Sequence, residues 1–363
     1  MKKTRKLLFP LLFSIILVAT AALHLASALS QGFADKINAS VSAAVRTFMS
    51  FLTGWFRFSL AEILLLSSPL LLFLLIFFGI RAIKSAAAFR RYVAATLSGL
   101  LAFYLLFVLT LGVGYRTTPL EKRMALPDTA VTGERLYAVS LWALNKADRL
   151  CVGMKADKDT GSRMPLSWEE MTAELNTAYA RLSEAYPFID RQSTALKPVM
   201  LSEPMTYTGI VGVYSFFTGE SNINTTYPDY CTVFTAAHEM AHQRGIARED
   251  EANFIAFLAC ISADSEYIRY AGYLNLTDYT ASALSQTDKP LYKDLVTHYS
   301  ERTIAEKRAA ALCYEAHRND TVRGVTESVN NSYLQSQGTQ GTVSYSLVVE
   351  LAVDYYTACV SDK

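Results

Sequence analysis

The chain has 363 residues, with 34 Lys and Arg against 33 Asp and Glu, which leaves a formal net charge of +1. This balance gives no sign of the basic surface that nucleic-acid-binding proteins carry, so we expect no nucleic acid partner. Hydrophobic residues make up 51% of the chain and are concentrated in its first third. The composition therefore predicts an N-terminal region whose partner is the lipid bilayer.

Three apolar segments, residues 7–29, 60–80 and 93–113, predict transmembrane helices. Each is about twenty residues long, which is enough to cross a hydrocarbon core of roughly 30 Å. A buried helix of a soluble protein rarely stays apolar on every side for so long. We therefore expect residues 1–115 to form the membrane domain of a multi-pass cell-membrane protein.

Basic residues predict the orientation of these spans. They precede the first span and fill the link between the second and the third: Lys2, Lys3, Arg5, Lys6, Arg81, Lys84, Arg90 and Arg91. The positive-inside rule assigns both segments to the cytoplasm, so everything after Val113 is expected on the extracytoplasmic side. A second interpretation makes residues 1–28 a cleaved signal peptide and leaves that location unchanged.

The segment 30–59 is rich in aromatic residues: Phe48, Phe51, Trp55, Phe56 and Phe58. This content predicts an amphipathic helix at the membrane interface, with the rings at headgroup level; a plain connector is the alternative. Glu62, at the edge of the second span, is expected to snorkel or to cap that helix.

Residues 116–133 predict a linker, and residues 134–363 a globular domain large enough for its own core. Ser167 and Glu170 are spaced as a capping box at the start of a helix. Helices are predicted over 134–150 and 167–186, and a Thr/Tyr-rich strand over 205–218. From Arg248 onward the chain is predicted to be mainly helical, through 291–317 and 343–358.

Residues 238–242 read His-Glu-Met-Ala-His, an HExxH motif. On a helix, positions i and i+4 share a face, so His238 and His242 can bind one metal ion, conventionally Zn²⁺. Glu239 lies beside that face and can take a proton from a water whose pKa the metal lowers to roughly 7. Gly245 is expected to end this helix in a left-handed turn, so that a second helix beginning near Arg248 folds back.

A catalytic zinc site needs a third protein ligand and an open position for water. Glu249, Asp250 and Glu251 are the candidates. Glu249 is favoured because Asn253, one turn on, can hydrogen-bond an imidazole, but the choice among the three acids stays open. The alternative to a metal site is a helix with two histidines that bind nothing.

HExxH followed by Glu249-x-x-Ala252-Asn253 resembles the gluzincin metallopeptidases. The resemblance implies that Glu249 is the third ligand, that Asn253 supports a zinc histidine, and that an edge strand binds extended substrate. Six residues separate His242 from Glu249, fewer than in most gluzincins. Metzincins carry a third histidine where this chain has Arg248, and arginine does not bind zinc.

The whole chain also resembles an uncharacterised family of bacterial membrane proteins with an HExxH domain. Residues 57–62, 212–224 and 237–254 carry this resemblance. It implies architecture rather than a substrate.

Together these expectations describe a mainly α chain, in which transmembrane helices precede an α+β zincin-like domain with a small β-sheet and an HExxH helix. The leading hypothesis is a membrane-anchored, extracytoplasmic zinc metallopeptidase that cleaves peptide or protein substrates, with His238, His242 and Glu249 on the metal and Glu239 as general base. The alternative is a catalytically inactive zinc-binding membrane scaffold or envelope sensor. An intramembrane protease is disfavoured because residues 232–248 are short and polar. The group that stabilises the oxyanion stays open among Tyr207, Tyr214, Tyr227, His298 and His317.

Overall fold

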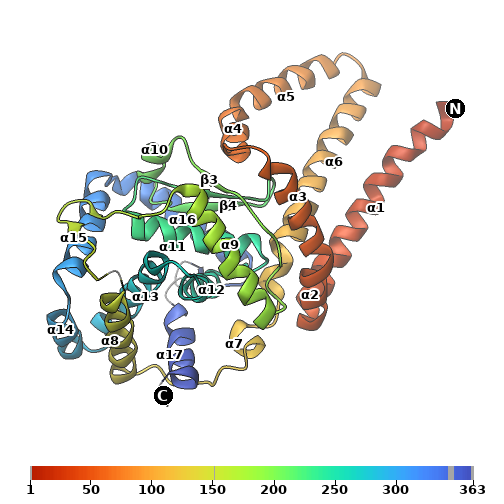
Figure 1. Ribbon diagram of the computed structural model, residues 1–363. Helices are drawn as coiled ribbons and strands as arrows, with labels where there is room; N and C mark the ends of the chain where they lie inside the picture. Colours follow the sequence, from red (N-terminus) through yellow and green to blue (C-terminus); the bar gives the residue numbers. More distant parts are fainter. Residues whose placement is uncertain (1, 151, 342–346, 361–363) are drawn as a thin grey trace.

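The computed structural model describes residues 2–150, 152–341 and 347–360, and within the first helix it describes side chains from Phe13 onward. The chain is mainly helical with two small sheets, which confirms the expected mainly α class. The described residues from about 120 to 360 form a helical body, and the N-terminal helices project from one side of it (Figure 1).

The projecting helices are α1 (Lys2–Leu29), α4 (Leu60–Leu66), α5 (Ser68–Ala82) and α6 (Ala86–Thr110). Within the described residues, α6 alone is long and apolar enough to cross a membrane, or two spans qualify if α4 and α5 count as one. The α4–α5 pair bends by 51° where Pro69, which lacks an N–H donor, follows Ser67 and Ser68. The apolar part of α1, Phe13–Leu29, is shorter.

The segment between α1 and α4 forms α2 (Gln31–Ile37), a π-helical turn η1 (Asn38–Ser42) and α3 (Ala43–Gly54). Its aromatic side chains are exposed, as the predicted amphipathic helix requires: Trp55 is 74% and Phe51 62% exposed. The opposite face is polar and buried against the body through Asn38, Ser42, Arg46 and Ser50, four residues apart in turn.

Glu62 neither snorkels nor caps its own helix, so that prediction is wrong. Its side chain is buried, and its two carboxylate oxygens accept hydrogen bonds from the backbone N–H groups of Met200 (2.9 Å) and Leu201 (2.8 Å). The carboxylate therefore ties α4 to the body, where those two N–H groups need acceptors.

The body is built around α11, α12 and α13, which pack on one another and share one hydrophobic core with α8, α9 and α17 (Figure 1). Its helices are α7 (Leu120–Arg123), α8 (Gly133–Arg149), α9 (Trp168–Ala185), α10 (Ser202–Thr206), α11 (Asp229–Gln243), α12 (Glu249–Ile261), α13 (Glu266–Thr287), α14 (Lys289–Thr297), α15 (Glu301–Ala316), α16 (Asp320–Ser336) and α17 (Val348–Cys359). The helices predicted over 134–150 and 167–186 are confirmed, including the capping box of Ser167 and Glu170. The region 291–317, predicted to be mainly helical, holds α14 and α15, which confirms that prediction; of the helical region predicted over 343–358, residues 343–346 lie outside the described part.

Two small sheets complete the body. Strands β1 (Ala156–Asp157) and β2 (Gly161–Ser162) pair antiparallel. In the second sheet the order is β3-β5-β4, with β3 (Leu196–Pro198) parallel and β4 (Gly212–Ser215) antiparallel to β5 (Glu220–Ile223). Among the described residues no strand pairs with the other side of β4, which is therefore an edge of this sheet.

The strand predicted over 205–218 is correct only for residues 212–215. Residues 202–206 instead form the short helix α10. Pro204 sits in the first turn of α10, where its missing N–H costs nothing, and Gly209 turns the chain at φ +77° before β4 begins. Both signals lie in the sequence, and they limit the strand that its Thr/Tyr-rich composition predicts.

Candidate metal centre

The HExxH helix α11 lies in the middle of the core. Val233, Ala236, Ala237 and Met240 are fully buried, and the small alanines let neighbouring elements approach closely. The α11 backbone also receives side-chain hydrogen bonds, because Ser221 on β5 donates to the Glu239 carbonyl at 2.9 Å. Packing on this stripe fixes the direction in which the adjoining stripe of histidines points.

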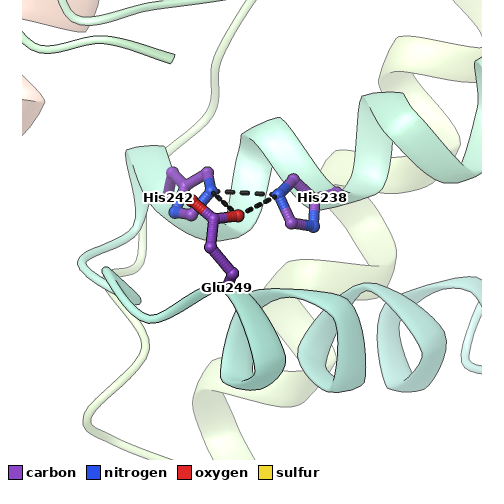
Figure 2. Close-up of side chains that lie close together, drawn as sticks. All are labelled: His238, His242 and Glu249. Atoms are coloured by element: carbon purple, nitrogen blue, oxygen red, sulfur yellow. Dashed lines mark hydrogen bonds and ion pairs between the residues drawn. The ribbon is translucent and has the colours of Figure 1, made fainter. Parts of the chain in front are cut away.

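Gly245 ends α11 as the sequence predicts, with a φ of +91°. Its N–H donates to the His242 carbonyl at 3.0 Å, and the Ile246 N–H donates to the Ala241 carbonyl at 3.2 Å. This left-handed turn sends the chain back, so that α12 starts beside the end of α11 (Figure 2). Glu249, the first residue of α12, then faces the two histidines.

Three side-chain donor atoms converge in the space between the two helices (Figure 2). The Nε2 atoms of His238 and His242 are 3.0 Å apart. Oε2 of Glu249 lies 3.2 Å from Nε2 of His238 and 3.4 Å from Nε2 of His242. Tetrahedral zinc with bonds of about 2.0–2.2 Å separates its ligand atoms by about 3.3 Å. The three distances therefore fit the face of a zinc tetrahedron, with the fourth corner left for water.

The hydrogen bond of His242 sets its tautomer. Nδ1 lies 2.8 Å from the Ile246 carbonyl oxygen, which can only accept, so Nδ1 carries the proton. In the neutral ring, Nε2 then presents a lone pair to the cluster, as a metal-binding histidine does. Burial works to lower the pKa of His242, but the Glu249 carboxylate outweighs it and raises the pKa to about 9.

The pKa of Glu249 moves the other way. Burial works to raise it, but the two imidazoles, above all His242, hold the pKa of this carboxyl well below its usual range. The shifts of both groups show that the cluster attracts positive charge. A divalent cation would supply that charge and would satisfy all three donors at once.

Glu239 is almost fully buried beside the cluster and against β4. Burial raises the pKa of its carboxyl, and Glu249 adds to the effect, while the imidazoles and the Tyr214 backbone N–H oppose it. Among the described residues, Oε2 of Glu239 and Nδ1 of His238 have no hydrogen-bond partner. An unpartnered buried carboxylate oxygen at this point fits a site that also holds a water molecule.

The structure separates the three acids that the sequence left open. Glu251 turns away from the cluster: it pairs with Arg123 at 2.7 Å and with Arg248, and accepts the Leu120 N–H at 2.9 Å. Asp250 is half-buried, and burial raises its pKa to about 7, but it does not join the cluster of donors in the described residues. The geometry therefore favours Glu249.

Asn253 does not make the expected hydrogen bond to an imidazole. Its Oδ1 accepts from the Tyr279 hydroxyl at 3.1 Å, and its Nδ2 is buried with no partner among the described residues. Tyr279 lies on α13, and no local sequence pattern predicts its hydrogen bond to the Asn253 side chain. The backbone carbonyl of Ile246 instead orients a histidine, and the sequence carries no signal for it.

Residues 39–353 match the family described as "Protein of unknown function (DUF3810)". The chain belongs to this family. No curated protein and no solved structure matches the chain. Membership of the DUF3810 family confirms the expected uncharacterised family, and the function has to be argued from the site.

The candidates for oxyanion stabilisation lie in other contacts. Nδ1 of His298, the exposed residue that caps the C-terminus of α14, lies 3.0 Å from the Asp294 carbonyl oxygen. Nδ1 of His317 contacts the Cys313 carbonyl at 2.8 Å, and its ring lies 5.2 Å from that of Tyr207. Tyr227 is hydrogen-bonded to Arg323. The hydroxyl group of Tyr214 is buried and has no hydrogen-bond partner among the described residues. The choice among them stays a prediction.

Gly212 on β4 is a site residue that the sequence analysis missed, although a glycine in a strand often marks a close approach. A Cβ there would lie 2.6 Å from Cγ2 of Thr235 and 2.8 Å from Oε1 of Glu239. Gly212→Ala is therefore expected to displace Glu239, to retain bound zinc, and to lower the peptidase activity proposed below by about 100-fold. Metal analysis and kcat measured on one preparation check this.

Gly324→Ala is the matched control, because the added methyl group meets nothing within 4 Å. It should keep wild-type activity. Unchanged activity in Gly212→Ala would show that contact with Gly212 does not position Glu239.

Proposed function

We propose that this DUF3810 protein is a membrane-anchored, zinc-dependent metallopeptidase whose site faces the extracytoplasmic side. The observation that carries the proposal is the convergence of His238, His242 and Glu249 at zinc-ligand spacing beside the buried carboxylate of Glu239. A purely structural zinc site has no need for that fourth group.

A bound Zn²⁺ would polarise the scissile carbonyl and lower the pKa of a water at its open position to roughly 7. Glu239 takes the proton of the attacking water and passes it to the leaving amine. Burial raises the pKa of the Glu239 carboxyl toward neutral pH. A general base works best when its pKa lies near the pH of the reaction. The Ile246 carbonyl holds the ring of His242 in the required tautomer.

The free edge of β4 supports a peptide as the substrate. The Asn224 N–H donates to the Val211 carbonyl at 3.0 Å. From Val211 onward, the backbone N–H and C=O groups of every second residue therefore point toward β5. The backbone groups of Gly212 and Tyr214 then point to the free edge, and the Tyr214 N–H reaches Glu239. An extended peptide pairing with this edge would lie next to the general base.

The arrangement of the apolar helices supports the proposed location. The link between α5 and α6 lies at the end of the helical hairpin remote from the body (Figure 1). This link and its flanks carry Arg81, Lys84, Arg90 and Arg91 and no acidic residue. If the positive-inside rule keeps the link in the cytoplasm, the body lies across the membrane from it.

One observation favours the second candidate, a catalytically silent zinc centre in a membrane scaffold or sensor. The side chains of His242 and Glu249 are only 9% and 10% exposed, and that of His238 12%. Such burial is typical of a zinc site that holds a fold together. A search for turnover separates the two candidates.

The test uses the full chain in detergent, assayed for bound metal and for cleavage of a broad peptide library. We expect one zinc ion per chain, and cleavage that stops after chelation and in His238→Ala. Zinc without cleavage would support the silent centre, and a wild-type protein that binds no zinc would contradict both candidates.

A further inference from the structure

The turn that joins the two metal-binding helices is held by the N-terminal helices. Arg46 on α3 is fully buried. Its guanidinium donates from Nη1 to Oδ1 of Asn38 at 2.9 Å, from Nη2 to the Asn38 carbonyl at 2.8 Å, and from Nε to Oδ2 of Asp190 at 2.8 Å. The contacts to Asp190 and to the Asn38 carbonyl fix the guanidinium, and its Nη1 then holds the side-chain amide oxygen of Asn38 in place.

Asn38 in turn holds Gly245. Its Nδ2 donates to the Gly245 carbonyl at 3.0 Å, in the buried interior and 207 residues away along the chain. Arg46 reaches the same glycine, because a Cβ on Gly245 would lie 2.6 Å from Nη2 of Arg46. Asn38 begins the π-helical turn η1, an irregularity that often marks functional positions in helices.

The residues after Gly245 lead directly to the metal donors. The neighbouring carbonyl, of Ile246, accepts the hydrogen bond that orients His242, and Glu249 follows three residues later. The 3-10 helix η2 (Gly112–Arg116), which follows α6, supports the same turn, since a Cβ on Gly114 would lie 2.8 Å from Cβ of Ala247. A shift of Gly245 would therefore move the Ile246 carbonyl, which orients His242, and the backbone of Glu249.

We propose that Asn38 and Arg46 are positioning residues for the metal centre, so that zinc affinity depends on how the N-terminal helices sit against the body. This inference rests on the metal site of the proposed function. It goes beyond that function in making the membrane-associated segment a part of the site. Zinc binding and the seating of α3 are then coupled: each favours the other.

The test compares Asn38→Ala with Glu62→Gln in the full chain in detergent. Glu62 also joins an N-terminal helix to the body, but through Met200 and Leu201 rather than the Gly245 turn. The measurements are the Kd for Zn²⁺ by competition with a chelator, the visible absorption of the Co²⁺-loaded protein, and Tm. We expect Asn38→Ala to weaken zinc binding about 10- to 100-fold and to shift the Co²⁺ absorption. Glu62→Gln should lower Tm without either change.

Arg46→Lys is the second variant if Asn38→Ala does not fold. It keeps a positive charge beside Asp190 but loses the paired contacts to Asn38, so it should also weaken zinc binding. Wild-type zinc affinity in either folded variant would overturn the inference, as would an equal loss in Glu62→Gln.

The two proposals fail separately. A wild type that binds zinc but cleaves no peptide overturns the peptidase proposal alone, and the loss of affinity in Asn38→Ala still supports the positioning role. A wild type that binds no zinc overturns both.

Discussion

Glu239→Gln is expected to keep its zinc and to lose hydrolysis, with kcat falling by about 10²- to 10⁴-fold. The amide has the shape of the carboxylate and fills the same space beneath β4, but it cannot accept the proton of the attacking water. The three metal donors are untouched by the change. Metal analysis and single-turnover cleavage, measured on the same preparation, check the prediction.

The control is Glu184→Gln, which makes the same chemical change at an exposed ion pair with Arg191. It should retain wild-type kcat. Full activity in Glu239→Gln would refute the general-base mechanism, whereas loss of zinc in that variant would mean that Glu239 itself holds the metal.

Glu249→Gln is expected to weaken zinc binding by more than about 100-fold. Removing a residue that only hydrogen-bonds to a metal ligand already lowers metal affinity about 10- to 100-fold, and Glu249 is proposed to be a ligand itself. The neutral amide also removes the negative charge that holds both imidazoles around the cation. Asp250→Asn, one residue on, should leave the affinity unchanged, since Asp250 lies outside the donor cluster among the described residues. Competition titration with a chelator measures both.

Asp250→Asn is a matched control for Glu249→Gln, because both substitutions change one carboxylate to an amide in the first turn of α12. A loss of affinity in Asp250→Asn with retention in Glu249→Gln would reverse the assignment of the third ligand. Equal losses in both would point to the summed charge of the turn rather than to a direct ligand.

Local features of this protein could be predicted from the sequence. The helical spacing of His238 and His242, the glycine that ends their helix and the capping box at Ser167 depend on residues within one or two turns of each other. Such features are governed by backbone geometry that short segments already possess. The mainly α class and α6 as a candidate span follow from apolar periodicity and length.

The choice of Glu249 required the tertiary structure. The sequence favours Glu249 but leaves Asp250 and Glu251 open, and the packing of α7, which brings Arg123 and the Leu120 N–H to Glu251, removes one of them. The same holds for Asn253, which Tyr279 engages from another helix.

The contact between the N-terminal helices and the metal turn was also decided by the tertiary structure. Polar residues at 38, 42, 46 and 50 recur every four positions in an apolar segment, so the sequence by itself determines that one face of this segment is polar. Whether that face meets water, lipid headgroups or protein is not a local property. It is decided by Asp190 and the Gly245 carbonyl, which lie 144 and 207 residues from their partners Arg46 and Asn38. Their hydrogen bonds form only once the whole body has folded, because buried polar groups need partners that distant parts of the chain supply.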